Sequence, residues 1–191
     1  MSPRTQEQFE EIRGEKKHLI MHVALELFAN EGYHPTSISK IAKKAGISKG
    51  LMYNYFKSKE DLLKQIIVEG MNEIFESFDP NKDGILTKEE FVFFIKESAN
   101  MIKSKITFWK LYFSLMIQPS VLAVIGEDFM ASFDWYFKII ADYFNKQGFE
   151  NGYAEVRFFI AMLDGVALHY ILDPEHFPYE EAIGRIINIY A

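Results

Sequence analysis

A short stretch near the N-terminus carries the side chains whose types and spacing best suit a specific chemistry. Its members are Ser48, Lys49, Gly50, Tyr53 and Asn54. Hydroxyl and ammonium groups bind phosphate, and long polar side chains on a helix reach the edges of bases in a DNA groove. Gly50 lacks a side chain, so its backbone can approach a ligand closely. The stretch therefore indicates a surface for nucleic acid.

Two short helices joined by a glycine turn must position these groups. Thr36-Ser37 provides the N-cap of the first helix, and Ser48 caps the second, which we predict over residues 49–56. Gly46 permits the sharp turn between them. The apolar residues that can hold the two helices at a fixed angle are Ile38, Ile41, Ala42 and Ile47. This is the pattern of a helix-turn-helix, which places its second helix in the major groove of DNA.

The charge distribution favours the same interpretation. The 191 residues carry a formal net charge of −6. Residues 36–64 nevertheless hold seven lysines and only two acidic residues, a local charge of +5, whereas residues 71–191 hold 10 basic and 18 acidic residues, a charge of −8. A basic patch on an acidic body is the electrostatic footprint of a DNA-binding head. The alternative is a solvated helical face without a partner.

The composition disfavours several other classes of protein. There are no cysteines, which excludes disulfides, thiolate catalysis and cysteine-based zinc sites. The first 19 residues are polar and charged, and no apolar run reaches 18 residues. We therefore expect neither a signal peptide nor a membrane span, and a cytoplasmic location. No nucleophile–base pairing, phosphate-binding glycine loop or His/carboxylate cluster is evident, so we expect no enzyme.

The spacing of apolar residues predicts helices along the whole chain. It is helical in residues 17–31, where Gly32 provides a stop, and again in residues 59–78. The polar residues 1–16 either fray or extend the first helix. Further helices are predicted at 88–104, 105–117, 120–147, 151–171 and 178–190. We therefore expect an all-α fold. Its N-terminal three-helix helix-turn-helix domain would span residues 1–60, and its C-terminal helical ligand-binding and dimerisation bundle residues 61–191.

The region from Ile20 to Leu63 resembles a known family. The resemblance is carried by Ala24-Leu25-Glu26-Leu27-Phe28, Gly32-Tyr33, Thr36-Ser37-Ile38, Ile41-Ala42, Ala45-Gly46-Ile47-Ser48-Lys49-Gly50, Tyr53-Asn54-Tyr55-Phe56 and Lys59-Glu60-Asp61-Leu62. In these residues the chain is similar to the TetR/AcrR family of bacterial repressors. Members of that family bind near-palindromic double-stranded operators as two-fold dimers. An activator would use the same reading head, so the sequence does not separate the two.

The resemblance implies roles for single residues. Lys49 and Asn54 would read base edges. Phosphate contacts are implied for Thr36 or Ser37, for Tyr53 and Tyr55 on either side of the recognition helix, and for Lys59 at the start of the next helix. Tyr55 has half-buried packing as its alternative.

Residues 79–90 fit the twelve-residue EF-hand calcium loop. The ligand positions are filled by Asp79, Asn81, Asp83, the Ile85 carbonyl, Thr87 and Glu90. The same stretch also contains turn residues, and Thr87 with Glu90 forms the capping box of a following helix. A Ca2+ site would make the chain a calcium-responsive regulator, or an interaction module without DNA binding. The alternative is a capped turn between two helices, and both interpretations stay open.

Aromatic residues make up 16% of the chain and are dense after residue 107. The resembled family holds a ligand pocket in this body. The candidate pocket residues are Phe108, Trp109, Tyr112, Phe113, Met116, Phe133 and Tyr136. Such a lining would suit a small planar or amphipathic apolar effector. The alternative is that these rings are ordinary core, because helical bundles need filling.

The last two predicted helices are expected to form a homodimer interface, as the resemblance implies. Their broad apolar face comprises Phe158, Phe159, Met162, Leu163, Val166, Ala167 and Tyr170. The alternative is that this face is buried within one subunit. In the dimer, an effector bound in the body would favour a different spacing of the two recognition helices and so release the operator.

Overall fold

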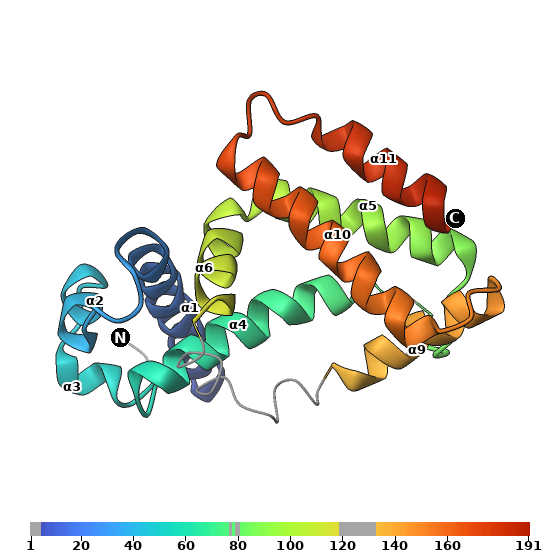
Figure 1. Ribbon diagram of the computed structural model, residues 1–191. Helices are drawn as coiled ribbons and strands as arrows, with labels where there is room; N and C mark the ends of the chain where they lie inside the picture. The colour runs from blue at the N-terminus through green and yellow to red at the C-terminus, as the bar shows by residue number, and fades with distance from the viewer. Residues whose placement is uncertain (1–4, 77, 79–80, 119–132) are drawn as a thin grey trace. The chain divides into compact units, whose positions relative to one another are not determined.

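The computed structural model describes residues 5–76, 78, 81–118 and 133–191 (Figure 1). The regular secondary structure of these residues is helical and includes no strand, so the all-α prediction is confirmed. The helices are α1 (Gln6–Glu31), α2 (Ile38–Lys44), α3 (Lys49–Met52), α4 (Lys59–Glu76), α5 (Lys88–Ser104), α6 (Ile106–Met116), α9 (Asp134–Lys146), α10 (Gly152–Leu172) and α11 (Tyr179–Tyr190). They divide into two compact units, residues 1–68 with 110–125 and residues 69–109 with 126–191.

The first unit contains the predicted helix-turn-helix, and local capping explains its helix boundaries. The Ser37 hydroxyl accepts the backbone N–H of Lys40 at the start of α2, and the Ser48 hydroxyl accepts that of Leu51 at the start of α3. Gly46 lies between the two helices with φ +68°, a conformation that suits glycine. The core that holds these helices consists of Ile20, Ala24, Phe28, Ile41, Met52, Phe56, Leu62 and Leu63.

The structure fixes the ends of two helices of the first unit. The first helix begins at Gln6, so residues 6–16 extend it rather than fray, and Thr5 and Gln8 form the capping box at its start. The recognition helix α3 ends at Met52, and residues 53–55 continue as turn rather than helix. Phe56 is buried at 2% exposure, which is the core role that its position in the pattern indicates.

The second unit is built around stacked aromatic rings. The ring of Phe91 on α5 lies 4.6 Å from that of Tyr143 and 5.2 Å from that of Phe159, measured between centroids. Helix α10 packs against both α9 and α11, and α11 also packs against α5 (Figure 1). Helices α9 and α10 approach closely at Gly152, where a Cβ atom would lie 2.2 Å from the backbone oxygen of Ala141.

The predicted helix over residues 120–147 is described only in its C-terminal part, where α9 confirms it; residues 119–132 lie outside the described residues. Within the described ranges, no helix combines the length and the apolar character that a membrane crossing requires.

Candidate nucleic-acid interface

The surface of α3 carries the residues first singled out in the sequence. Lys49, Gly50 and Asn54 are exposed, and Tyr53 is 50% exposed. A Cβ atom at Gly50 would meet only the hydroxyl of Ser48, at 4.0 Å, so packing within the chain does not require a glycine there. The helix and the turn after it therefore present a shallow surface with one cation, one amide and one phenol, which suits close approach to DNA.

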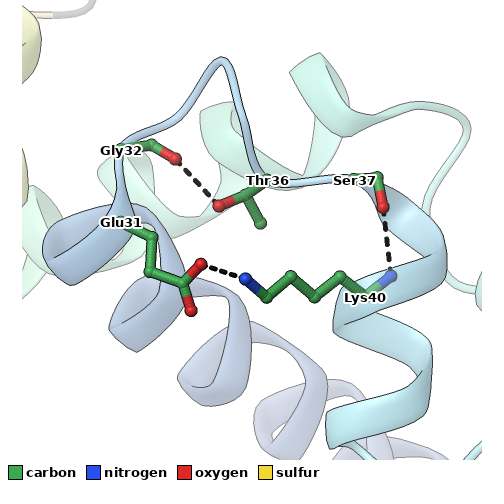
Figure 2. Close-up of polar contacts among 5 residues, drawn as sticks. All are labelled: Glu31, Gly32, Thr36, Ser37 and Lys40. Atoms are coloured by element: carbon green, nitrogen blue, oxygen red, sulfur yellow. Dashed lines mark hydrogen bonds and ion pairs between the residues drawn. The ribbon is translucent and has the colours of Figure 1, made fainter.

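Thr36 and Ser37 differ in what their hydroxyl groups can reach (Figure 2). Thr36 is fully buried, and its hydroxyl donates to the Gly32 carbonyl at 2.8 Å. Ser37 is exposed, and its hydroxyl accepts the Lys40 N–H at 3.2 Å. Lys40 also forms an ion pair with Glu31 across the connection between α1 and α2. Of the two hydroxyls, that of Ser37 is the one available to a phosphate, whereas that of Thr36 holds the connection in shape.

The resemblance implies a phosphate contact for Lys59, but its ammonium group is hydrogen-bonded within the first unit. Its ammonium group donates to the carbonyls of Tyr33 at 3.0 Å, His34 at 3.2 Å and Thr36 at 3.1 Å. It also lies 4.3 Å from the centroid of the Tyr33 ring. An ammonium has three N–H donors, and these contacts use all three. In this structure Lys59 ties the start of α4 to the connection between α1 and α2.

The neighbouring Glu60 makes a further contact between the start of α4 and the connection between α1 and α2. The Tyr33 hydroxyl donates to the Glu60 carboxylate at 3.2 Å. Backbone and Ser58 hydrogen bonds to that carboxylate lower the pKa of Glu60 from its usual value, so it is ionised at neutral pH. Burial raises the pKa of Tyr33, so its phenol stays protonated as the donor.

Tyr55 is half-buried, with its ring centroid 6.5 Å from that of Phe56. Both packing and a phosphate contact are compatible with this position.

Ion pairs reduce the field of the basic patch. Lys44 pairs with Glu26 at 3.0 Å and Lys40 pairs with Glu31, and both acidic partners lie on α1 outside the lysine-rich stretch. The exposed Lys43 and Lys49 have no ion pair with the described residues. Charge on this surface is therefore concentrated on fewer lysines than the sequence count suggests.

The loop of residues 79–90 is described only from Asn81 onward; Asp79, its first ligand position, lies outside the described residues. The Thr87 hydroxyl accepts the Glu90 N–H at 3.2 Å, and the Glu90 carboxylate accepts the Thr87 N–H at 2.9 Å. The capping box is therefore confirmed. Asp83 accepts the Ile85 N–H at 2.8 Å. In the part of the chain that is described, no three His, Cys, Asp or Glu residues gather as they would around a metal. Calcium binding stays a prediction.

The predicted pocket residues fall into both units. Phe108, Trp109 and Phe133 are buried and Tyr136 is half-buried in the second unit. Tyr112, Phe113 and Met116 belong to the first. In the second unit, two rings that were not among the candidates join the cluster: Phe75 stacks on Tyr136 at 4.0 Å between centroids, and Phe78 lies 5.6 Å from Tyr136. Helical spacing along α4 was the signal that could have included Phe75; Phe78 lies beyond the end of that helix.

Two polar groups inside the second unit were not predicted as site residues. Ser98 is only 7% exposed, and its hydroxyl has no hydrogen-bond partner among the described residues. Asp164 on α10 is largely buried, and burial raises its pKa to about 6. Neither position carries a sequence pattern that predicts its burial.

The apolar face predicted for dimerisation is divided between the interior and the surface. Phe159 and Ala167 are buried inside the subunit, whereas Phe158 is 59% exposed. The exposed side of α10 continues with Leu168 at 39% and Leu172 at 71% exposure. Part of the expected face is therefore internal core, and a second apolar stripe lies at the surface.

Residues 20–66 match the family model of the bacterial regulatory proteins of the tetR family. The chain is 36% identical over 84 residues to the fatty acid metabolism regulator protein of Bacillus subtilis. The aligned region covers 44% of this chain and only 43% of that protein. The chain is 31% identical over 150 residues to the HTH-type transcriptional regulator YxaF of the same organism, which covers 75% of each chain.

A similar fold is found in the transcriptional regulator FadR from Bacillus subtilis, solved in complex with stearoyl-CoA. The TM-score is 0.74 at 18% sequence identity, and the alignment covers 91% of this chain and 96% of that one. At this identity the likeness is one of fold, and it includes both units of the chain.

Proposed function

Because the chain belongs to the tetR family of bacterial regulatory proteins, we propose that it is a transcriptional repressor that binds a near-palindromic operator as a homodimer and is released by a small ligand. The observation that carries this proposal is the exposed surface of α3. It combines Lys49 and the side-chain-free Gly50 on a helix whose inner residue Met52 is 1% exposed, with the exposed Asn54 in the turn that follows the helix. A polar outer face on a rigidly packed short helix is what direct reading of the major groove requires.

In this proposal the residues of the head have separate tasks. Lys49 and Asn54 read base edges, and Ser48 lies at the cap of the reading helix. Ser37 and Tyr53 bind phosphate, with Tyr55 beside them. Thr36 and Lys59 act through the backbone that they hold, since their polar groups are occupied by carbonyls.

The exposed apolar stripe on α10 supports a second copy of this chain as the partner. Phe158, Leu168 and Leu172 lie on one side of the helix, and Ile189 on α11 adds a further side chain that is 58% exposed. Large apolar side chains gathered on neighbouring helices mark an interaction surface. A dimer through α10 and α11 would cover this surface and hold two heads for two half-sites about 34–36 Å apart.

The effector that we propose is a long-chain acyl-CoA or a compound of similar amphipathic character. The relative named as a fatty acid metabolism regulator and the FadR structure with stearoyl-CoA support this class. The aromatic interior of the second unit, including Phe75, Phe133 and Tyr136, supports an apolar binding partner. Its binding would favour a spacing of the heads that no longer matches the operator.

Selection of duplexes from a random pool by the purified protein tests this function. We expect a near-palindromic sequence to be enriched, and the protein to shift it in a mobility assay. Stearoyl-CoA should then release the duplex, whereas free coenzyme A, which lacks the acyl chain, should not. Enrichment of no sequence would refute DNA-specific regulation. Enrichment without release by stearoyl-CoA would refute only the effector class.

A further inference from the structure

The N-terminal half of α1, residues 6–19, precedes the segment that matches the family model, which begins at residue 20. It is continuous with the rest of α1 and starts at the capping box of Thr5 and Gln8. At 1.5 Å per residue this arm adds about 20 Å of helix.

Three basic residues gather on one face of this arm, and a single carboxylate, that of Glu10, lies among them, three residues before Arg13. Arg13, Lys16 and Lys17 follow the i, i+3, i+4 spacing of one helix face. The same face continues into Ile20 and Ala24, which are fully buried in the first unit. The basic residues are thus on the side of α1 that faces the head, and Lys16 and Lys17 are half-buried there.

The opposite side of the arm is acidic. Glu11 and Glu15 are both exposed and lie on the face away from the buried stripe of α1. Arg13, Lys16 and Lys17 with Glu10 leave a net positive charge on the face toward the first unit. The arrangement matches a negatively charged partner on the head side and water on the other.

One contact joins the basic face to the recognition segment. The Arg13 guanidinium donates to the backbone carbonyl of Asn54 at 3.4 Å, across 41 residues of sequence. Asn54 lies just after α3, where carbonyl groups carry the partial negative charge of a helix end. The contact places the basic face of the arm beside Tyr53 and Asn54, the exposed residues at the end of the reading helix.

We propose that this arm binds the DNA backbone beside the recognition helix: Lys16 and Lys17 contact phosphates, and Arg13 holds the arm against the end of α3. The inference rests on the proposed function, since it takes the surface of α3 as the side that meets DNA. Phosphate contacts carry no sequence information, so the arm adds affinity and fixes orientation while α3 reads the sequence.

The salt dependence of binding tests the arm. Binding constants of wild type and of the double variant Lys16→Gln, Lys17→Gln are measured from 50 to 200 mM KCl, on the enriched duplex and on a random duplex of equal length. Each lost phosphate contact reduces the slope of log K against log salt by about 0.9. We expect a loss of about 1.8 for each bound subunit, and a similar weakening on both duplexes.

The matched control removes two lysines elsewhere. Lys88 and Lys96 are exposed on α5 in the second unit, and Lys88→Gln with Lys96→Gln makes the same change in net charge. This pair should leave the slope unchanged. Circular-dichroism melting verifies that both double variants remain folded.

If the slope of log K against log salt is unchanged in the Lys16, Lys17 variant, or falls equally in the control, the proposed phosphate contacts of the arm are wrong. If wild type binds the random duplex but enriches no sequence, the proposed function fails, and the slope on the random duplex still decides the arm. If wild type binds no duplex at all, both proposals fall together.

Discussion

Gly50 shows how one residue can be neutral for the fold and decisive for the surface. Its environment holds no atom closer than 4.0 Å to a Cβ and its backbone is not left-handed, so Gly50→Ala introduces no strain. Alanine favours a helix over glycine by about 0.5–1 kcal/mol, so we expect the variant to be at least as stable as wild type. We also expect the methyl group to weaken operator binding by about tenfold, equal to about 1.4 kcal/mol. Urea titration and a mobility assay measure the two effects; full affinity would show that DNA does not approach this backbone.

Lys59 is a residue whose role in the structure differs from the role that its family position implies. Lys59→Met keeps the aliphatic stem and removes the ammonium group, leaving three carbonyls without a donor. We expect the stability of the head to fall by about 1–3 kcal/mol. Operator affinity should fall as well, but with an unchanged salt slope, because no phosphate contact is lost.

Lys57→Met provides the comparison for this prediction, since the exposed Lys57 side chain lies two residues before the start of α4. If the Lys59→Met protein has normal stability and its salt slope falls by about one, Lys59 contacts a phosphate and the role assigned here is wrong. Thermal melting and salt-dependent binding together separate the two roles.

Asp164 gives a prediction for pH. Its pKa is raised by burial to about 6, above its ordinary value of 3.8. The folded protein therefore binds this proton more tightly than the unfolded chain does, and folding loses stability as the pH rises from about 4 through 6. Asp164→Asn removes that penalty, so its gain over wild type should be about 1 kcal/mol at pH 4.5 and reach about 3 kcal/mol at pH 7.5. Urea unfolding at both values measures it; the exposed Asp142→Asn should show no such trend, and a gain independent of pH would contradict the assignment.

At the scale of elements, the α5 N-terminus gives a prediction of its own. Thr87→Ala removes the hydroxyl of the capping box one helical turn before the buried Phe91, and we expect a loss of about 1 kcal/mol in global stability. Thr5→Ala removes the same motif from the exposed arm of α1, where local fraying absorbs the loss without affecting the core. Urea midpoints compare the two; equal losses would show that the arm is part of the cooperative core.

Elements with strong end signals could be predicted from the sequence, and those without could not. The bounds of α5 agree with the predicted helix 88–104 because the capping box fixes its start. The start of α1 could not be decided between fraying and extension of residues 1–16, although Thr5 and Gln8 carry the same signal, since the polar residues after them show little apolar periodicity. The orientation of Lys59 could not be predicted, because its partners lie 23–26 residues away and follow from tertiary packing. Likewise, Phe158 and Phe159 looked alike in sequence, yet one is exposed and the other buried.

At the scale of the whole molecule, the proposed repressor depends on joining two heads. A single head with a few phosphate contacts binds weakly, whereas two linked heads gain affinity from the high effective concentration of the second. The exposed stripe of α10 and α11 is the surface that would link them. Disruption of that stripe should therefore weaken DNA binding without altering any residue of the head.

Phe158→Glu makes this test, since it places a charge on a side chain that is 59% exposed and absent from the internal core. We expect the variant to sediment as a folded monomer at micromolar concentration and to bind the operator about 100-fold more weakly than wild type. Phe93→Glu alters a side chain that is 46% exposed on α5 and should leave both the mass and the affinity unchanged. A dimeric Phe158→Glu protein would place the interface elsewhere. A monomer with undiminished affinity would show that each head binds its half-site alone, and the spacing of the two heads could then not control release of the operator.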